Sequence, residues 1–258
     1  MNYDDRIVCF LDVLGFREHI HKTIGVSGND NVDRISEIVE AIQEAGQILE
    51  IDQQKIFSPK RITQFSDSIV ISFPADKESG VYHAIEEILW VQMSFLKRDM
   101  LCRGAIARGK LMHGSDVLFG PAMVDAYMLE SKAANYPRVI LDQAIIDAGA
   151  AAHSMHHGSE DEREGIMRFL SKDGDGMYYI DYISKARSEC DSPEEHPAYL
   201  LKLRKIIVHG VQNQDPSVRV KYLWLKEKFA SCLELIKRNV SAAPGDELNA
   251  TYLAIPEL

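Results

Sequence analysis

Along the first half of the chain, short apolar runs alternate with stretches in which hydrophobic residues recur at helical spacing. Short apolar runs rich in Ile, Val and Phe are typical of buried strands, because they are too short for most helices. Such runs cover residues 7–13, 61–73, 101–108 and 138–141. Apolar residues that recur at helical spacing predict amphipathic helices. These stretches cover about 31–50, 78–98 and 120–134.

The order of these elements predicts an α+β fold. The run over 61–73 divides into two strands, with Phe65, Ser66 and Asp67 at the bend between them. The order through residue 108 is then β-α-β-β-α-β, the ferredoxin-like unit, with a further helix and strand after it. Helices that cover one face of an antiparallel sheet would give an α+β domain.

The last part of the chain is predicted to be a mainly helical extension. A strand is expected over 177–183, and helices are expected near 198–212 and over 216–239. The chain therefore divides into a core at 1–142 and a C-terminal extension at 143–258, packed on the core. The sequence does not indicate what the extension does.

Composition and charge narrow the class of protein. Hydrophobic residues make up 46% and charged residues 26%, as in an ordinary soluble globular protein. The formal net charge is −10, which argues against a general binder of nucleic acids or anionic membranes. An anionic small substrate stays possible, because bound cations reverse the local field.

The cysteines and the N-terminus favour a cytoplasmic protein. None of the four cysteines forms a C-x-x-C pair, so the sequence suggests neither a zinc site nor a redox motif. Cys9 and Cys102 lie inside apolar runs and are expected to be core thiols. Residues 1–6 lack the basic start of a signal peptide, and no apolar stretch is as long as a membrane span.

Two aspartates, each at the edge of an apolar strand, are the strongest candidates for chemistry. They are Asp12 and Asp67. A carboxylate in such a position is costly to bury unless it is paired or binds a metal. On neighbouring strands, two carboxylates could share divalent cations that bridge phosphates. The alternative is a capping or salt-bridged role for each.

A second candidate metal cluster lies at 153–165, where three histidines precede four acidic residues. The low hydrophobicity of this stretch favours a solvated loop over a metal site.

The pattern resembles the class III nucleotidyl cyclase domain. The likeness spans about residues 6–142, and three blocks in the family's order carry it. The blocks are residues 10–16 around Asp12, 65–68 around Asp67, and 103–109 followed by 119–120 and 129–131.

Departures from the family pattern point to one branch of it. The family's transition-state Asn and Arg fall on Val124 and Met128, and its purine-reading Lys falls on Thr63. The chain instead resembles the bacterial pyrimidine cyclases of the Pycsar anti-phage systems, which make cyclic UMP or cyclic CMP as an infection signal. The residues of this second likeness are Arg103-Gly104-Ala105, Ala126-Tyr127, Glu130-Ser131 and 135–138.

The resemblance implies a two-metal mechanism. Asp12 and Asp67 would ligate two Mn²⁺ or Mg²⁺ ions, with the backbone carbonyl of Val13 completing one shell. The 3′-oxygen of UTP, or less readily CTP, would attack the α-phosphorus and release pyrophosphate. Backbone N–H groups would cradle the β and γ phosphates. These are the amides of Leu14, Gly15, Phe16 and Arg17.

The resemblance also requires a positive charge opposite the reacting phosphate. The candidates are Arg103, Arg108, Lys110 and Arg138. Arg103 is either a catalytic, substrate-binding residue or half of a structural ion pair. On the third helix, Tyr127 could stack on a base and Glu130 could hold an arginine, or the two could be a packing residue and a solvated acid. Thr63 would also face the substrate.

A family with composite sites implies a homodimer, in which one subunit supplies the metals and the other the base-facing helix. No nucleic acid or membrane partner is expected, and a separate effector protein would read the product. Two other functions stay open: a cyclase-fold nucleotide sensor that has lost catalysis, and a purine cyclase that uses ATP or GTP. The sequence does not indicate what triggers activity.

Overall fold

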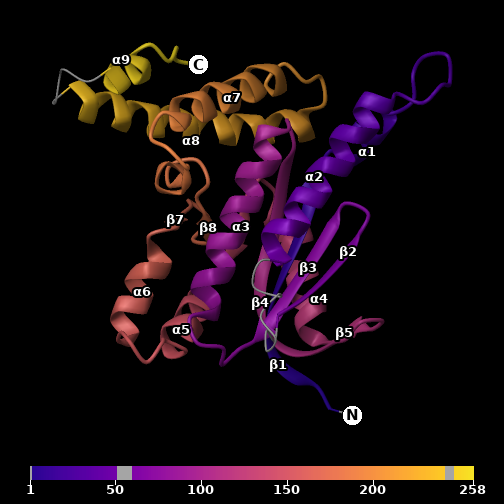
Figure 1. Cartoon of the computed structure of the whole chain (residues 1–258), viewed down its shortest axis with the longest axis vertical. Helices are drawn as coiled ribbons and strands as arrows, with labels where there is room; N and C mark the ends of the chain where they lie inside the picture. The colour runs from indigo at the N-terminus through magenta and orange to yellow at the C-terminus, as the bar shows by residue number, and fades with distance from the viewer. Residues whose placement is uncertain (1, 51–59, 242–246) are drawn as a thin grey trace. The chain divides into compact units, whose positions relative to one another are not determined.

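The computed structural model describes residues 2–50, 60–241 and 247–258. The chain divides into two compact units, Met1–Ile180 and Asp181–Leu258. The strands of the first unit, labelled in Figure 1, are β1 (Asp4–Leu14), β2 (Arg61–Phe65), β3 (Ser68–Pro74), β4 (Leu101–His113), β5 (Leu118–Phe119), β6 (Val139–Leu141), β7 (Leu170–Lys172) and β8 (Tyr178–Ile180). Its helices are α1 (Phe16–His21), α2 (Val32–Glu50), α3 (Gly80–Lys97), α4 (Pro121–Ala133), α5 (Gln143–Ala151) and α6 (Ser159–Met167).

The sheet of the first unit is mainly antiparallel and confirms the predicted α+β class. Its strand order is β2-β3-β1-β4-β6-β8-β7, and β5 pairs with β4 off this path. The first four of these strands pair antiparallel, whereas β4 and β6 pair in parallel. This order places β3 between β2 and β1, as the split β-α-β units of the ferredoxin-like pattern require.

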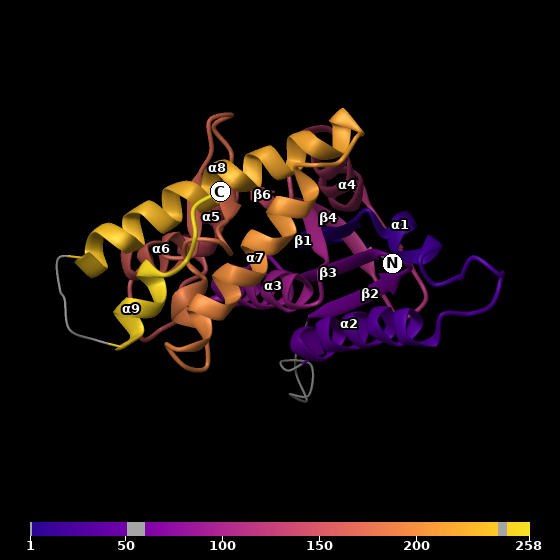
Figure 2. The same ribbon diagram turned by 90° about the horizontal axis from the view of Figure 1, so that it is seen from above.

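Helices cover both faces of this sheet, whereas the sequence predicts cover on one face. Figure 2 shows α2 and α3 on one side of β1 and β3, and α4 on the other. On the α4 side, Val8 and Phe10 of β1 pack in one buried cluster with Ala122 and Ala126 of α4. The helix lies close to the strands because the residues between them are small: a Cβ at Gly109 would meet Ala122 at 3.5 Å.

The strand predicted over 101–108 continues as far as His113. The turn that follows β4 therefore begins only at Gly114. Met112 and His113 pair with Phe119 and Leu118 of β5. The Gly114 N–H closes the turn by donating to the Val117 carbonyl at 2.8 Å.

The first compact unit extends past residue 142, where the sequence predicts its end. The hairpin of β7 and β8 joins the main sheet through pairing of β8 with β6. The division between the units therefore follows Ile180 rather than residue 142. The physical reason is that backbone pairing ties these late strands to the core.

The second unit is mainly helical, as predicted. It contains a short 3-10 helix, η1 (Ala186–Glu189), and α7 (Glu195–Gly210), α8 (Pro216–Ser241) and α9 (Glu247–Leu253). Its interior includes a hydrogen bond of 2.9 Å between His196 Nδ1 and the Tyr252 hydroxyl. Packing of this unit on the core stays a prediction.

Cys9 and Cys102 are buried and free, as expected for core thiols. Burial, followed by the nearby charge of Asp12, raises the pKa of Cys102 to about 12. Across the described ranges, none of the helices has the length and apolar character needed to cross a membrane.

Candidate functional site

The two aspartates that the sequence singles out lie at the same end of the sheet. Asp12, near the end of β1, pairs in register with Ser68 of β3. Asp67 directly precedes Ser68, in the two-residue turn between β2 and β3. The turn is fixed to β1 because the Val13 N–H donates to the Asp67 carbonyl at 3.1 Å. Backbone pairing therefore brings both carboxylates to adjoining positions.

The backbone of this turn includes one residue with an unusual conformation. Ser66 has a φ of 54°, in the left-handed region that few residues other than glycine adopt. Ser66 adopts this conformation although it is not a glycine.

Arg103 connects Asp12 to a buried glutamate. It pairs in register with Asp12 across β1 and β4, and its Nε–H donates to Asp12 Oδ2 at 3.4 Å. The same Nε forms an ion pair with Glu130 Oε1 at 2.6 Å. The Glu130 side chain is 2% exposed, while the side chains of Arg103 and Asp12 are each 23% exposed. Asp12 and Arg103 are therefore accessible to solvent, while the buried Glu130 carboxylate holds the Arg103 side chain in place.

The contacts of Arg103 decide part of its predicted role. Within the described residues, its ion-pair partners are these two carboxylates, both through Nε. Its terminal amino groups therefore stay available for an anionic ligand. Glu130 pairs with an arginine, which is one of the two roles expected for it from the sequence. Its carboxylate is buried and not solvated.

Structural contacts hold two other candidate cations. Arg138 is fully buried and pairs with Asp173 and Asp175. Arg108 pairs with Asp5 of β1 at 2.7 Å. Because side chains alternate along a strand, Arg108 and Lys110 point to the face of β4 opposite Arg103. Arg103 is the candidate that shares a face with Asp12.

The glycine of the Arg103-Gly104-Ala105 block has a packing reason. A Cβ at Gly104 would lie 2.5 Å from the Phe10 carbonyl oxygen and 2.8 Å from Leu11 Cδ2. β1 and β4 therefore approach each other closely just where Asp12 and Arg103 are paired.

The α4 helix presents an aromatic ring on the same face. The ring of Tyr127 meets Phe10 edge to face, with centroids 5.6 Å apart, and Tyr127 is 49% exposed. Val124 and Met128, where the family has its transition-state Asn and Arg, are exposed apolar residues. This part of α4 can therefore offer a base a stacking surface, but neither of those two polar groups.

Gly15 ends β1 and begins α1. A Cβ at this position would meet no atom within 4 Å, so crowding does not explain the glycine. The reason is its φ of 71°, which lies in the left-handed region that glycine adopts without strain. Its carbonyl accepts the Glu18 N–H at 2.8 Å. The first N–H groups of a helix have no partner inside it. A phosphate cradle built from the amides of residues 14–17 stays a prediction.

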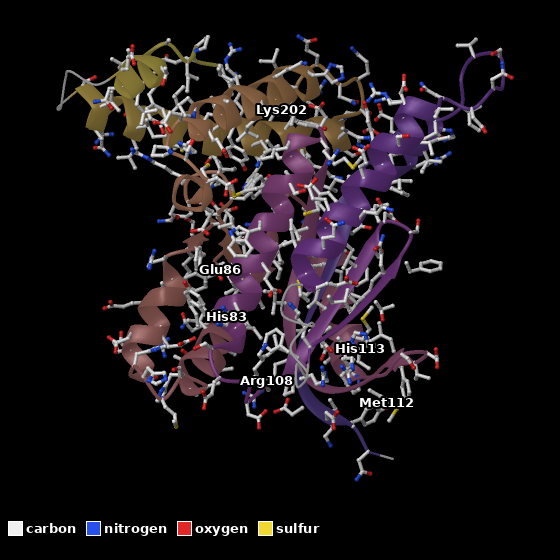
Figure 3. The ribbon with its side chains drawn as sticks, in the orientation of Figure 1. His83, Glu86, Arg108, Met112, His113 and Lys202 are labelled. Carbon is white, nitrogen blue, oxygen red and sulfur yellow. The ribbon has the colours of Figure 1, made fainter. Side chains whose placement is uncertain are left out.

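Thr63 is part of a hydrogen-bond network that the sequence does not reveal. Its Oγ1 lies 2.8 Å from His113 Nε2, and His113 Nδ1 lies 2.8 Å from Ser72 Oγ. His113, labelled in Figure 3, is the last residue of β4. Burial, followed by the charges of Arg6 and Arg61, lowers the pKa of His113 to about 4. No local motif links His113 to Thr63, because the two residues are 50 positions apart in the chain.

The oxygen ligands at this end of the sheet fit divalent metal ions that are also bound by the phosphates of a substrate. The two aspartates and the Val13 carbonyl offer the oxygen ligands that Mg²⁺ and Mn²⁺ prefer. Over the described ranges, no group of three or more His, Cys, Asp and Glu forms a ready-made metal site. Mg²⁺ is commonly bound by one or two carboxylates together with substrate phosphates, so the residues present suffice.

One histidine of the stretch after α5 takes part in a structural contact. Glu162 of α6 is 2% exposed and accepts the Ser79 hydroxyl at 2.8 Å. His157 also contacts this carboxylate. These contacts connect α6 to the start of α3.

No family model and no curated protein matches the chain. A bacterial light-regulated adenylyl cyclase is 15% identical, with a TM-score of 0.35, over 57% of this chain and 44% of that one. A class III adenylyl cyclase-like ATP-binding protein from Pseudomonas aeruginosa is 11% identical, with a TM-score of 0.42, over 64% of this chain and 40% of that one.

A third solved structure is similar over nearly its whole length. It is the catalytic core of a rhodopsin-guanylyl cyclase with converted specificity in complex with ATPalphaS. It is 14% identical, with a TM-score of 0.40, over 70% of this chain and 96% of that one. The chain spans less than half the length of the first two structures. At these identities and TM-scores, the likeness decides nothing about the activity of this chain.

Proposed function

We propose that the protein is a nucleotidyl cyclase that converts UTP, or less readily CTP, into the 3′,5′-cyclic monophosphate and pyrophosphate. The observation that carries the proposal is the pairing of Asp12 with Arg103 beside the turn that holds Asp67. Three sequence blocks, separated by up to about 90 residues, supply these side chains, and they meet at one end of the sheet.

The acidic residues would hold the metal ions. Asp12, Asp67 and the Val13 carbonyl would ligate Mn²⁺ or Mg²⁺, which when bound neutralise phosphate charge and lower the pKa of the 3′-hydroxyl. Asp12 is partly exposed, so a triphosphate and its cations can reach it.

Arg103 would supply positive charge to the phosphates. Negative charge that develops in a transition state is stabilised best by donors that are already in place. Glu130 holds the guanidinium from the buried side, so the terminal amino groups can face a phosphate without reorganisation. Glu130 is then a positioning residue rather than a group that touches the substrate.

The pyrimidine preference comes from the base-facing residues. Tyr127 offers an exposed ring that could stack on a base. Thr63 takes the position where the resembling family has a purine-reading lysine, and a shorter side chain there changes which base can be reached. Together they support a pyrimidine substrate.

A homodimer with composite sites fits the exposed surface of the α4 face. Large exposed apolar side chains are a common mark of protein interfaces. Those of β2, β5 and α4 include Phe65, Phe119, Val124, Tyr127 and Met128. One subunit would supply the metals and the phosphate site, and its partner the base-facing residues. The cyclic product would act as a second messenger in bacterial antiviral defence, read by a separate effector.

One observation favours a second candidate function. Val124 and Met128 leave the α4 helix without the family's polar pair, as in a nucleotide sensor that no longer catalyses. The retained aspartates oppose this, because a sensor that does not cleave a phosphate bond has less need of both. A purine cyclase with relocated specificity residues is the third candidate.

Purified protein with Mn²⁺ and each of the four ribonucleoside triphosphates in turn tests all three candidates. Products are resolved by mass. Cyclic UMP from UTP, absent with Asp67→Asn and present with the surface control Asp33→Asn, is the expected result. A cyclic purine product would replace the pyrimidine proposal. Tight nucleotide binding without any cyclic product would favour the sensor.

A further inference from the structure

A chain of hydrogen bonds connects β1 to Thr63 across the sheet. The Arg6 Nε–H donates to Ser72 Oγ at 2.9 Å, and Arg6 Nη2 donates to the Ser72 carbonyl at 3.1 Å. Ser72 Oγ then contacts His113 Nδ1, and His113 Nε2 contacts Thr63 Oγ1, each at 2.8 Å. Three of these side chains are buried, and Thr63 at the end is partly exposed.

The first member of this chain fixes its direction. A guanidinium can only donate hydrogen bonds, so Ser72 Oγ accepts from Arg6. Ser72 is fully buried, and the described residues offer its hydroxyl proton one acceptor, His113 Nδ1. An unpartnered buried O–H would be costly, so Ser72 donates to His113.

The tautomer of His113 follows from the same network. Its lowered pKa, about 4, keeps the ring neutral at neutral pH, so only one ring nitrogen carries a proton. With Nδ1 as acceptor, that proton lies on Nε2, an assignment made from the hydrogen-bond network. His113 Nε2–H therefore donates to Thr63 Oγ1. Among the described residues Thr63 Oγ1 has no other partner, so its own proton is left to donate outward.

The sheet register places Thr63 near the other candidate residues. Thr63 pairs with Val70, and Val70 pairs with Phe10, the residue that Tyr127 contacts. The next row on the same face contains Asp12 and Arg103. Thr63 therefore lies on the face that carries Tyr127, so one subunit would supply both base-facing residues.

We infer that His113 is a positioning residue that makes the Thr63 hydroxyl a hydrogen-bond donor toward the base of a bound nucleotide. An oriented O–H group donates to a carbonyl oxygen at the base edge that it meets, whereas an amino group there leaves the O–H without an acceptor. Uracil and cytosine differ in this respect, because uracil carries a carbonyl where cytosine carries an amino group. The network thus selects UTP over CTP. This inference rests on the proposed function, which places Thr63 beside the base.

Binding of nucleotides that cannot cyclise separates this inference from the activity. The dissociation constants of 3′-deoxy-UTP and 3′-deoxy-CTP are measured by calorimetry with Mg²⁺, for wild type and two pairs of variants. Thr63→Val removes the hydroxyl and Thr63→Ser keeps it. His113→Asn is too short to reach Thr63, whereas His113→Gln can place an amide N–H near the Nε2 position. The exposed His153→Gln is the surface control.

We expect the wild type to prefer the uracil nucleotide. Thr63→Val and His113→Asn should reduce that preference about 5- to 10-fold, the value of one neutral hydrogen bond. Thr63→Ser, His113→Gln and His153→Gln should keep it. An unchanged preference in folded Thr63→Val and His113→Asn would overturn the inference, even if the protein makes cyclic UMP. Loss of preference without any cyclic product would support the network and contradict only the proposed enzyme.

The tautomer gives a direct test that needs no variant. Nitrogen chemical shifts of the His113 ring in the wild-type protein distinguish the Nε2–H form from the Nδ1–H form. The Nε2–H form is expected at neutral pH, and the Nδ1–H form would overturn the inference.

Discussion

Arg103 on β4 and Glu130 on α4 form an ion pair of 2.6 Å that is buried at its acidic end. Arg103 also donates to Asp12, so one guanidinium connects the helix to the candidate metal site. Loss of either member of a buried pair leaves a charge without compensation. The pair therefore gives predictions about both stability and activity.

Removal of Arg103 should destabilise the protein. In Arg103→Ala the buried Glu130 carboxylate loses its partner, so we expect the free energy of unfolding to fall by about 3 kcal/mol. The double variant Arg103→Met with Glu130→Met should recover most of this loss without recovering activity. Urea unfolding followed by circular dichroism measures the stability. Equal stability of Arg103→Ala and the wild type would show that the ion pair contributes little.

The neutral variant Glu130→Gln tests positioning of Arg103. The amide keeps the size of the side chain but loses the charge that holds the guanidinium. We expect kcat to fall about 10- to 100-fold while the KM for the triphosphate changes less, because the charge acts mainly in the transition state. Rates at several UTP concentrations measure both constants. A change in KM alone would place Arg103 in ground-state binding.

Mixing of inactive variants tests the composite dimer. Arg103 lies with Asp12 in one chain, so it belongs to the metal half of a site. Asp67→Asn mixed with Tyr127→Ala should then recover up to about a quarter of wild-type activity, because half of the dimers are mixed and one of their two sites is intact. Asp67→Asn mixed with Arg103→Ala should recover none, since both changes affect the same half. Recovery in the second mixture but not in the first would refute this assignment of the halves.

Stability should fall as the pH is lowered through the range in which His113 titrates. Burial, with Arg6 and Arg61 nearby, lowers the pKa of His113 from 6.5 to about 4. Between these values the unfolded state binds more protons, so the free energy of unfolding rises with pH and falls on acidification. The loss is complete near pH 4 and amounts to about 3 kcal/mol at most.

Urea unfolding at several pH values between about 7 and 4 measures this slope. Burial also lowers the pKa of His196 in the second unit to about 4, so His196 adds to the pH dependence of the free energy of unfolding. His113→Gln should flatten the profile, while His153→Gln should leave it unchanged. Identical slopes for wild type and His113→Gln would contradict the lowered pKa of His113.

The order of the elements and the two aspartates at strand edges can be predicted from the sequence alone. Apolar runs and helical periods are local, so β1, α3 and α4 can be recognised from neighbouring residues alone. The placement of Asp12 and Asp67 on adjoining strands followed from the ferredoxin-like order, because that order fixes which strands pair.

The roles of the basic residues depend on contacts between distant parts of the chain. Arg103 and Arg138 look alike in the sequence, but one shares a face with Asp12 and the other is buried against Asp173 and Asp175. Local pattern cannot distinguish them, because the deciding carboxylates are far away along the chain.

The contact of His113 with Thr63 joins residues 50 positions apart, and the unit boundary at Ile180 depends on pairing of β8 with β6. Such long-range contacts depend on how strands curve and pair. Those are properties of the folded sheet rather than of any short segment.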